Sequence, residues 1–215
     1  MVGEKKHKAL QPLQDNAPDL VASFGLITDK DVTKRFAEAA IFIRSHGLPV
    51  VGKPDVGQRG RGVFVARTTE QANQYLSRFS GAVIVQKHIE GEEFGIFVAR
   101  RPGELLPDIL SLVHKTFPCV KGDGVQNLKQ LIVSNAQAKL ISRLLFKRWA
   151  AELSRVAAVG EVVKPVEIGA HCRGSLFLDG REHATPELVA TLVRLLDAVP
   201  GYAFGRMDVC VPIYP

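Results

Sequence analysis

The strongest constraint on this chain is the stretch from Pro49 to Glu93, where a lysine closes a short apolar strand and a glycine-rich loop follows. The strand is Val50-Val51-Gly52-Lys53, and the loop reads Asp-Val-Gly-Gln-Arg-Gly-Arg-Gly. A lysine at the inner end of an apolar strand should be partly buried, which is costly unless an anion pairs with it. The stretch therefore predicts an anion site centred on Lys53. The alternative is an edge-strand lysine whose amine reaches solvent.

The loop after Lys53 has the composition of a phosphate-binding loop. Gly57, Gly60 and Gly62 let backbone N–H groups approach oxygen without a side chain in the way. Arg59 and Arg61 could close over the same phosphates as charge-assisted donors. The loop joins two strands, whereas the P-loop and the dinucleotide fingerprint run from strand into helix. Taken alone it is also compatible with a hairpin that binds nothing and carries solvated arginines.

A second apolar strand, 83–86, supplies the third component. It leads into a segment that can offer backbone donors and acceptors to an adenine edge, namely Gln86, Lys87, His88 and Ile89. The turn at Gly91 then brings a carboxylate within reach of ribose hydroxyls. We expect Glu93 to be that carboxylate, with Glu92 as the competitor. The alternative interpretation is an acidic hairpin turn.

The rest of the chain alternates helical and strand patterns, which indicates an α+β fold. Thr28 and Asp31 resemble a helix start, and apolar residues then repeat at helical spacing until Gly47 and Pro49. Further helices are expected after Thr68, over 128–132 and 136–156, and from Thr185 to about 199. Strands are expected at 50–53, 63–67, 83–86, 93–100, 109–115 and 204–213, with short ones near Val162 and Leu176.

Composition excludes several classes of protein. The chain has 215 residues, 46% of them hydrophobic, and no apolar run approaches the length of a membrane span. The formal net charge is +6, but basic and acidic residues are interspersed, so we expect no nucleic-acid partner. The three cysteines are far apart and lack zinc-ligand spacing, which favours a reducing, cytoplasmic location. No secretory signal or membrane segment is expected.

Together the three components resemble the ATP-grasp superfamily, which includes D-alanine–D-alanine ligase, glutathione synthetase and cyanophycin synthetase. The shared pattern is a Val-x-Lys-Pro strand, a glycine-rich lid, a hinge strand and a Gly-x-Glu turn, here Val51 to Pro54, Gly57 to Gly62, and Gln86 to Glu93. The resemblance implies an ATP-grasp fold whose two α+β lobes grip ATP between antiparallel sheets. It implies Lys53 on the α- and β-phosphates, the Lys87 and Ile89 backbone on adenine, and Glu93 on ribose.

Two downstream segments extend the resemblance. Val120-Lys-Gly-Asp-Gly resembles a segment of cyanophycin synthetase that a basic residue precedes, which makes Lys115 a candidate second phosphate cation. Gly205-Arg-Met-Asp-Val resembles the ligase strand in which the arginine stabilises acyl-phosphate transfer and the aspartate binds magnesium. This implies a catalytic role for Arg206 and a metal role for Asp208. His171 resembles a phosphate-facing Asn or His of related ligases, although a loop histidine bonded to backbone is an equal alternative.

The chain departs from the family in one motif. The family supplies a Glu-x-Asn pair to magnesium, and no Glu-x-Asn occurs here. We expect a lead-in segment over 1–27, an N-terminal lobe over 28–115 and an incomplete C-terminal lobe over 116–215. The sequence is interpreted either as a fragment of a longer product, which we favour, or as a naturally reduced protein.

The implied function is an ATP-dependent carboxylate–amine or carboxylate–thiol ligase that acts through an acyl phosphate, with ATP and Mg²⁺ as cofactors. Its partners would be a small-molecule carboxylate and an amine, such as an amino acid or peptide. The alternative is a non-catalytic nucleotide-binding or regulatory module, which the missing metal motif favours. A homodimer is one of the oligomeric states that stay open.

Overall fold

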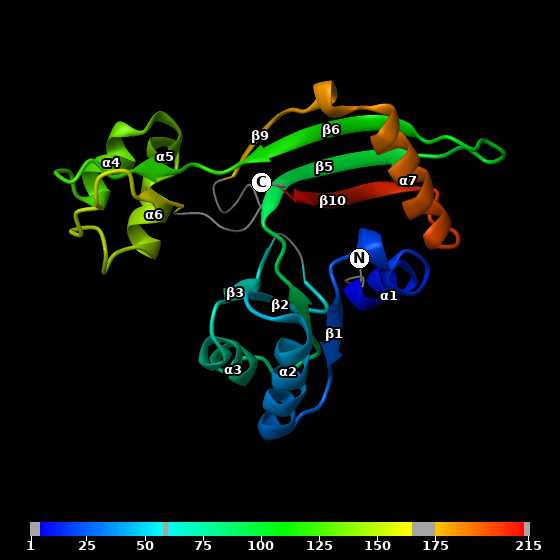
Figure 1. Ribbon diagram of the computed structural model, residues 1–215, viewed down its shortest axis with the longest axis horizontal. Coiled ribbons are helices and arrows are strands. Elements are labelled where there is room, and N and C mark those ends of the chain that lie inside the picture. Colours follow the sequence, from blue (N-terminus) through cyan, green and yellow to red (C-terminus); the bar gives the residue numbers. More distant parts are fainter. Residues whose placement is uncertain (1–4, 58–59, 165–174, 213–215) are drawn as a thin grey trace. The chain divides into compact units, whose positions relative to one another are not determined.

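The computed structural model describes residues 5–57, 60–164 and 175–212, and it contains two compact units. The first unit comprises residues 1–113 and 179–215, and the second comprises 114–178 (Figure 1). This division differs from the expected lobes, because residues 179–215 group with the N-terminal part of the chain rather than with 116–178.

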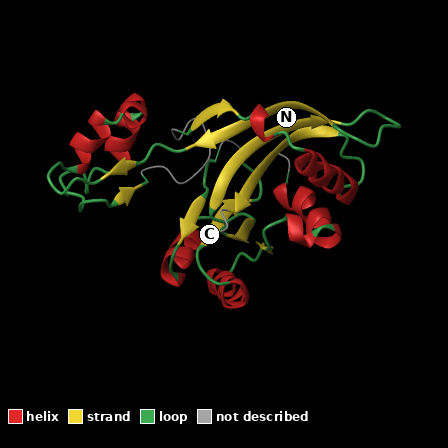
Figure 2. Ribbon diagram, turned by 45° about the horizontal axis from the view of Figure 1, so that its top comes forward, coloured by secondary structure: helices red, strands yellow, loops and turns green. Residues whose placement is uncertain are grey.

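The first unit contains a four-stranded sheet in the order β1-β4-β2-β3. Its strands are β1 (Phe24–Ile27), β2 (Val50–Pro54), β3 (Phe64–Ala66) and β4 (Val83–Lys87), and each neighbouring pair is antiparallel. Helices α2 (Val32–His46) and α3 (Thr69–Ser77) pack against it, as Figure 2 shows. Val50, Val83 and Val85 face these helices in a buried apolar cluster. Because side chains alternate along a strand, Lys53 and Gln86 point to the other face.

The helix boundaries follow from side-chain caps. Asp31 accepts from the backbone N–H groups of Thr33 and Lys34, so α2 begins one residue later and Thr28 is not its cap. The helix ends at His46 and is capped by Gly47, whose φ of 78° favours glycine. Thr68 caps α3 through the N–H of Gln71, at the position that the sequence indicated.

A second sheet runs in the order β10-β5-β6-β9. Its strands are β5 (Gly91–Ala99), β6 (Asp108–Thr116), β9 (Leu176–Asp179) and β10 (Phe204–Pro212). A short 3₁₀ turn, η3 (Arg181–His183), leads from β9 to helix α7 (Pro186–Ala198). Leu192, Leu195 and Leu196 of α7 are buried against Phe94, Ile96 and Val98 of β5, which closes the core on this face. The opposite face of β5 and β10 carries the polar side chains.

Residues 5–27, the described part of the expected lead-in segment, are ordered structure. They form helix α1 (Lys6–Asn16), the 3₁₀ turn η1 (Pro18–Leu20) and strand β1. The amide of Asn16 donates to the Ala198 carbonyl at the end of α7, and Leu13 and Leu20 pack against the core beneath α7. The segment is therefore an integral part of the first unit.

The second unit is a small helical domain with its own core. It holds β7 (Val120–Lys121), α4 (Leu128–Ser134), α5 (Ala136–Leu140), α6 (Ser142–Arg148) and β8 (Val162–Val163). The long helix expected over 136–156 is wrong, because it breaks at Ile141 and ends at Arg148. The following residues fold back instead, so that the carbonyls of Leu153 and Arg155 accept from the first N–H groups of α4.

None of the helices within the described ranges is long and apolar enough to cross a membrane.

Candidate functional site

Lys53 lies near the end of β2 and points away from the helices of its sheet. It pairs in register with Ile84, and its ammonium donates to the Gln86 side-chain oxygen at 2.7 Å. The Gln86 amide nitrogen in turn donates to the Ala22 carbonyl at 2.8 Å. Gln86 therefore presents its oxygen to Lys53 in a fixed orientation. This confirms the partly buried strand lysine that the sequence predicted.

The charge of Lys53 is poorly solvated. Burial is the main reason that its pKa falls from 10.5 to about 8, and the nearby charge of Lys6 lowers it further. Within the described ranges no carboxylate forms an ion pair with Lys53, and its hydrogen-bond partner Gln86 is neutral. A cation in such surroundings is stabilised by an anion that enters the site.

The glycine loop between β2 and β3 needs glycine at two of the three predicted positions. Gly60 and Gly62 have φ values of 68° and 74°, a region that other residues rarely adopt. A Cβ on Gly62 would also lie 2.7 Å from the Pro54 ring. The Gly62 carbonyl accepts from the Tyr75 hydroxyl at 2.7 Å. Tyr75 leaves no room for a side chain on Gly52 either.

The other loop residues are less constrained. Gly57 adopts an ordinary backbone conformation and its carbonyl accepts from Lys6, while Arg61 is exposed. Arg59, which was expected to cover the phosphates, lies outside the described residues.

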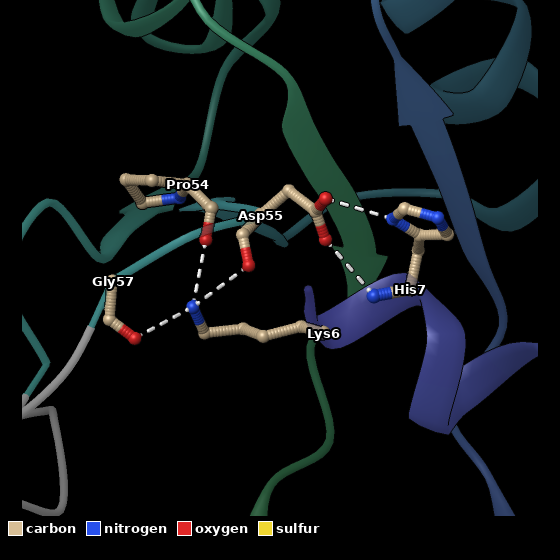
Figure 3. A network of polar contacts seen from close by, with 5 residues as sticks. All are labelled: Lys6, His7, Pro54, Asp55 and Gly57. Atoms are coloured by element: carbon tan, nitrogen blue, oxygen red, sulfur yellow. Dashed lines mark hydrogen bonds and ion pairs between the residues drawn. The ribbon is translucent and has the colours of Figure 1, made fainter. Parts of the chain in front are cut away.

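Two N-terminal residues that sequence reasoning missed hold the start of the loop (Figure 3). Asp55 is 1% exposed, and its carboxylate accepts from the His7 backbone N–H at 2.9 Å and lies 2.7 Å from His7 Nδ1. Burial alone would raise the pKa of Asp55, but the His7 hydrogen bonds and the charges of His7 and Lys6 together lower it. Lys6 binds three carbonyls of the same segment. No local sequence pattern pairs residues that are 48 positions apart.

The predicted adenine-binding segment begins inside the sheet. The Lys87 N–H donates to the Ser23 carbonyl and the His88 N–H donates to the Pro49 carbonyl. The fold therefore uses both of these N–H groups. The prediction that the backbone of this segment binds adenine now depends on the Lys87 carbonyl and the Ile89 N–H. The thiol of Cys210 on β10 donates to the Ile89 carbonyl at 3.5 Å, which ties this segment to the second sheet.

The two catalytic and metal candidates of β10 share one face of the second sheet with Glu93. In the antiparallel register Arg206 pairs with Phe97, Asp208 with Gly95, and Cys210 with Glu93. Directly paired residues point to the same side. The Arg206 and Asp208 side chains are 3.4 Å apart, and the Arg206 guanidinium lies where Gly95 has no side chain.

Lys115 belongs to the second unit, on the last part of β6. Lys115 is a buried residue, 3% exposed, and its role as a second phosphate cation stays a prediction. His171, the other residue expected near the phosphates, lies outside the described residues.

The described residues offer one plausible magnesium ligand rather than a complete cage. No cluster of three or more metal-binding side chains occurs within the ranges that the structure describes. Asp208 is a largely exposed carboxylate, with 63% of its side chain accessible. Mg²⁺ commonly takes one or two carboxylates and completes its octahedron with phosphate oxygens and water. Asp208 fits a metal that is held mainly by a bound triphosphate.

Comparison with known proteins finds relatives for the first part of the chain. Residues 3–98 match the model of a RimK-like ATP-grasp domain. A phosphoribosylamine–glycine ligase from Streptococcus pneumoniae R6 is 36% identical over 94 residues, which are 39% of this chain and 22% of that protein. The chain thus spans less than a quarter of the length of this relative.

Solved structures match the fold over nearly the whole chain. A D-alanine–D-alanine ligase from Bacillus anthracis superposes with a TM-score of 0.54 at 12% identity, covering 96% of this chain and 52% of that one. The same enzyme has also been solved in complex with ATP, and there the TM-score is 0.50, again at 12% identity, with coverage of 96% and 51%. These matches confirm the resemblance inferred from the motifs. The chain has the ATP-grasp fold.

The unusual charge of Lys53 leads to a prediction about stability. At pH 7 the folded state holds a poorly solvated ammonium, so Lys53→Met is expected to raise the free energy of unfolding by about 1–2 kcal/mol after the lost Gln86 hydrogen bond is subtracted. Between pH 8 and 10.5 the unfolded wild-type chain binds more protons than the folded one, so the wild type gains stability as pH rises. The advantage of the variant should shrink over this window.

Urea unfolding at pH 7 and at pH 10 measures both effects. Lys87→Met, which removes an exposed lysine from the adjacent strand, is the control and should change stability little. A Lys53→Met protein that is less stable than wild type at pH 7 would contradict the assignment of Lys53 as a poorly solvated cation.

Proposed function

We propose that this chain binds ATP and that Lys53 and the glycine loop hold its phosphates. The observation that carries the proposal is the buried ammonium of Lys53, which has a neutral hydrogen-bond partner and no carboxylate among the described residues. A phosphate oxygen would supply the missing negative charge. Gly60 and Gly62, in a backbone conformation that favours glycine, would supply N–H groups to the phosphates with no side chain of their own in the way.

The base and the sugar would lie along the connection from β4 to β5. The Lys87 carbonyl can accept from the adenine amino group, and the Ile89 N–H can donate to a ring nitrogen. Glu93 begins the polar face of β5 and would bind the ribose hydroxyls. Gln86 would contribute by holding Lys53 in place.

The chemistry that fits these residues is carboxylate activation. A substrate carboxylate attacks the γ-phosphorus of ATP, ADP leaves, and an acyl phosphate results. An amine then attacks the acyl carbon, and inorganic phosphate leaves with the bonding electrons. Arg206 would stabilise the oxyanion that develops at the acyl carbon, and Lys115 would offset charge on the transferring phosphoryl group. Mg²⁺ held by Asp208 and the phosphates would neutralise the triphosphate.

An amino-acid carboxylate is the first substrate class to test. The name of the S. pneumoniae relative includes glycine, and that of the B. anthracis structure includes D-alanine. A peptide or another small carboxylate with a small amine belongs to the same class. No covalent nucleophile on the protein is required, because the acyl phosphate is itself the activated species.

A second candidate function is nucleotide binding without turnover. It is favoured by the absence of Glu-x-Asn from the sequence, since that motif supplies the other magnesium ligands in the family that the chain resembles. In this case Lys53 and the glycine loop would keep their roles, whereas Arg206 and Asp208 would contribute little.

The proposal predicts a nucleotide affinity that depends on Lys53. Titration calorimetry with ATP and Mg²⁺ should detect binding to the wild type, and Lys53→Met should weaken it by about 10–100-fold, the value of one desolvated charge-assisted contact. Lys147→Met removes an exposed lysine from α6 and should leave the affinity unchanged. Equal ATP affinity of wild type and Lys53→Met would refute the assignment.

Turnover separates the two candidate functions. With Mg²⁺, ATP and a panel of amino acids paired with amines, a ligase should release phosphate only when both substrates are present. Arg206→Met should lower the rate by about 10²–10³-fold while ATP affinity is kept, because the arginine acts on the developing oxyanion. The exposed Arg181→Met is the control. ATP binding without phosphate release for any pair would favour the binding module.

A further inference from the structure

The ammonium group of Lys6 is surrounded by the backbone of the glycine loop. It donates to the carbonyl oxygens of Pro54 at 2.9 Å, Asp55 at 3.2 Å and Gly57 at 2.9 Å (Figure 3). All three carbonyls belong to the segment that directly follows Lys53. A side chain from the N-terminus thus fixes the first turn of the loop that we assign to phosphate binding.

The number of contacts decides what Lys6 can do. A lysine ammonium has three N–H donors, and here each has a carbonyl within hydrogen-bond distance. Direct binding of a phosphate would require at least one of these contacts to break. Lys6 is therefore suited to shape the loop and not to bind the nucleotide itself.

Residue 55 is held from two further directions. The Lys6 backbone N–H donates to the Asp55 carbonyl at 3.0 Å, and His7 binds the buried carboxylate through its backbone N–H and its ring. The pair Lys6–His7 thus holds both the main chain and the side chain of Asp55. These hydrogen bonds fix the orientation of the peptide planes at the start of the loop as well as the path of the chain.

The helix that presents Lys6 is itself anchored. At the other end of α1, the Asn16 amide donates to the Ala198 carbonyl at 2.9 Å, and Leu13 packs against the core beneath α7. The glycine loop is therefore tied, through Lys6 and α1, to the helix that covers the second sheet. The position of Lys6 is set by the contacts of α1 with α7 as well as by the loop.

We propose that Lys6 is a positioning residue of the phosphate site, which orders the start of the glycine loop by gathering the carbonyls of Pro54, Asp55 and Gly57. When the Asp55 carbonyl points toward Lys6, the planar trans peptide points the Val56 N–H the opposite way. The Asp55 N–H, which follows the Pro54 carbonyl, is used by the fold, because it donates to the Ala82 carbonyl. Lys6 thus sets the peptide planes at the start of the loop before the phosphates bind, and binding has less of the loop to order. The inference rests on the proposed function, since it assigns a role within that site.

Lys6→Met tests the inference, because it keeps most of the aliphatic stem and removes the three donors. The first readout is amide hydrogen exchange of peptides covering residues 54–64 in the nucleotide-free chain, which should become faster than in wild type. The second readout is ligand affinity. The affinity for ATP with Mg²⁺ should fall by about tenfold. The affinity for adenosine, measured by chemical-shift titration, should stay unchanged. Lys8→Met, an exposed lysine on the same helix, should change neither readout.

A second variant guards against misfolding. Lys6→Gln retains an amide with two donors and should lie between wild type and Lys6→Met in both exchange and ATP affinity. Unchanged exchange in Lys6→Met would overturn the proposal, and so would an equal loss of adenosine and ATP affinity, which indicates general damage. A wild-type chain that binds no ATP would refute the proposed function instead, while the exchange comparison would still decide whether Lys6 orders the loop.

Discussion

The first unit is organised around one unfavourable charge. Lys53 ends a strand whose neighbours are apolar, and burial lowers its pKa to about 8. Folding alone does not remove this cost, because the hydrogen-bond partner of Lys53 is the neutral side chain of Gln86. A site of this kind lowers the stability of the empty protein and strengthens its interaction with an anion. The glycine loop, which follows Lys53 directly, provides the space and the donors that such an anion needs.

Lys6, the second cation beside the loop, has the opposite surroundings, because its donors all have partners within the protein. Lys6 has a carbonyl for each of its donors, and Asp55 lies close enough to oppose the loss of charge that burial causes. Two lysines at one loop therefore have different roles, one as a candidate ligand and one as a support. The distinction depends on hydrogen-bond partners and could not be made from residue type.

Much of the site could be predicted because its residues are close in the sequence. The apolar strand with Lys53, the glycines and the turn before Glu93 form a continuous pattern, and the place of Lys53 at the inner end of that strand indicated its partial burial. The support of the site was missed because it is not local. Helix α1 is polar and contains Pro12, so its sequence indicates no stable helix, and its contacts lie at Asp55 and Ala198.

The errors in the fold have the same origin. The break at Ile141 carries no proline or glycine, and after α6 ends at Arg148 the chain turns back to meet the N-terminus of α4. The resemblance implied that the Lys87 backbone binds adenine, but the Ser23 carbonyl, just before strand β1, which the sequence did not reveal, already accepts from the Lys87 N–H. In each case a tertiary contact decided what local propensity left open.

The most direct test of Lys53 as a cation that lacks an anionic partner is a measurement of the pKa of its amine. NMR titration of the chain with isotope-labelled lysine gives this pKa with and without ATP and Mg²⁺. We expect a pKa near 8 in the free chain and a clear rise when nucleotide is bound, because a phosphate then stabilises the charged form. An ordinary lysine pKa near 10.5 in the free chain, or a lowered value that ATP leaves unchanged, would contradict it.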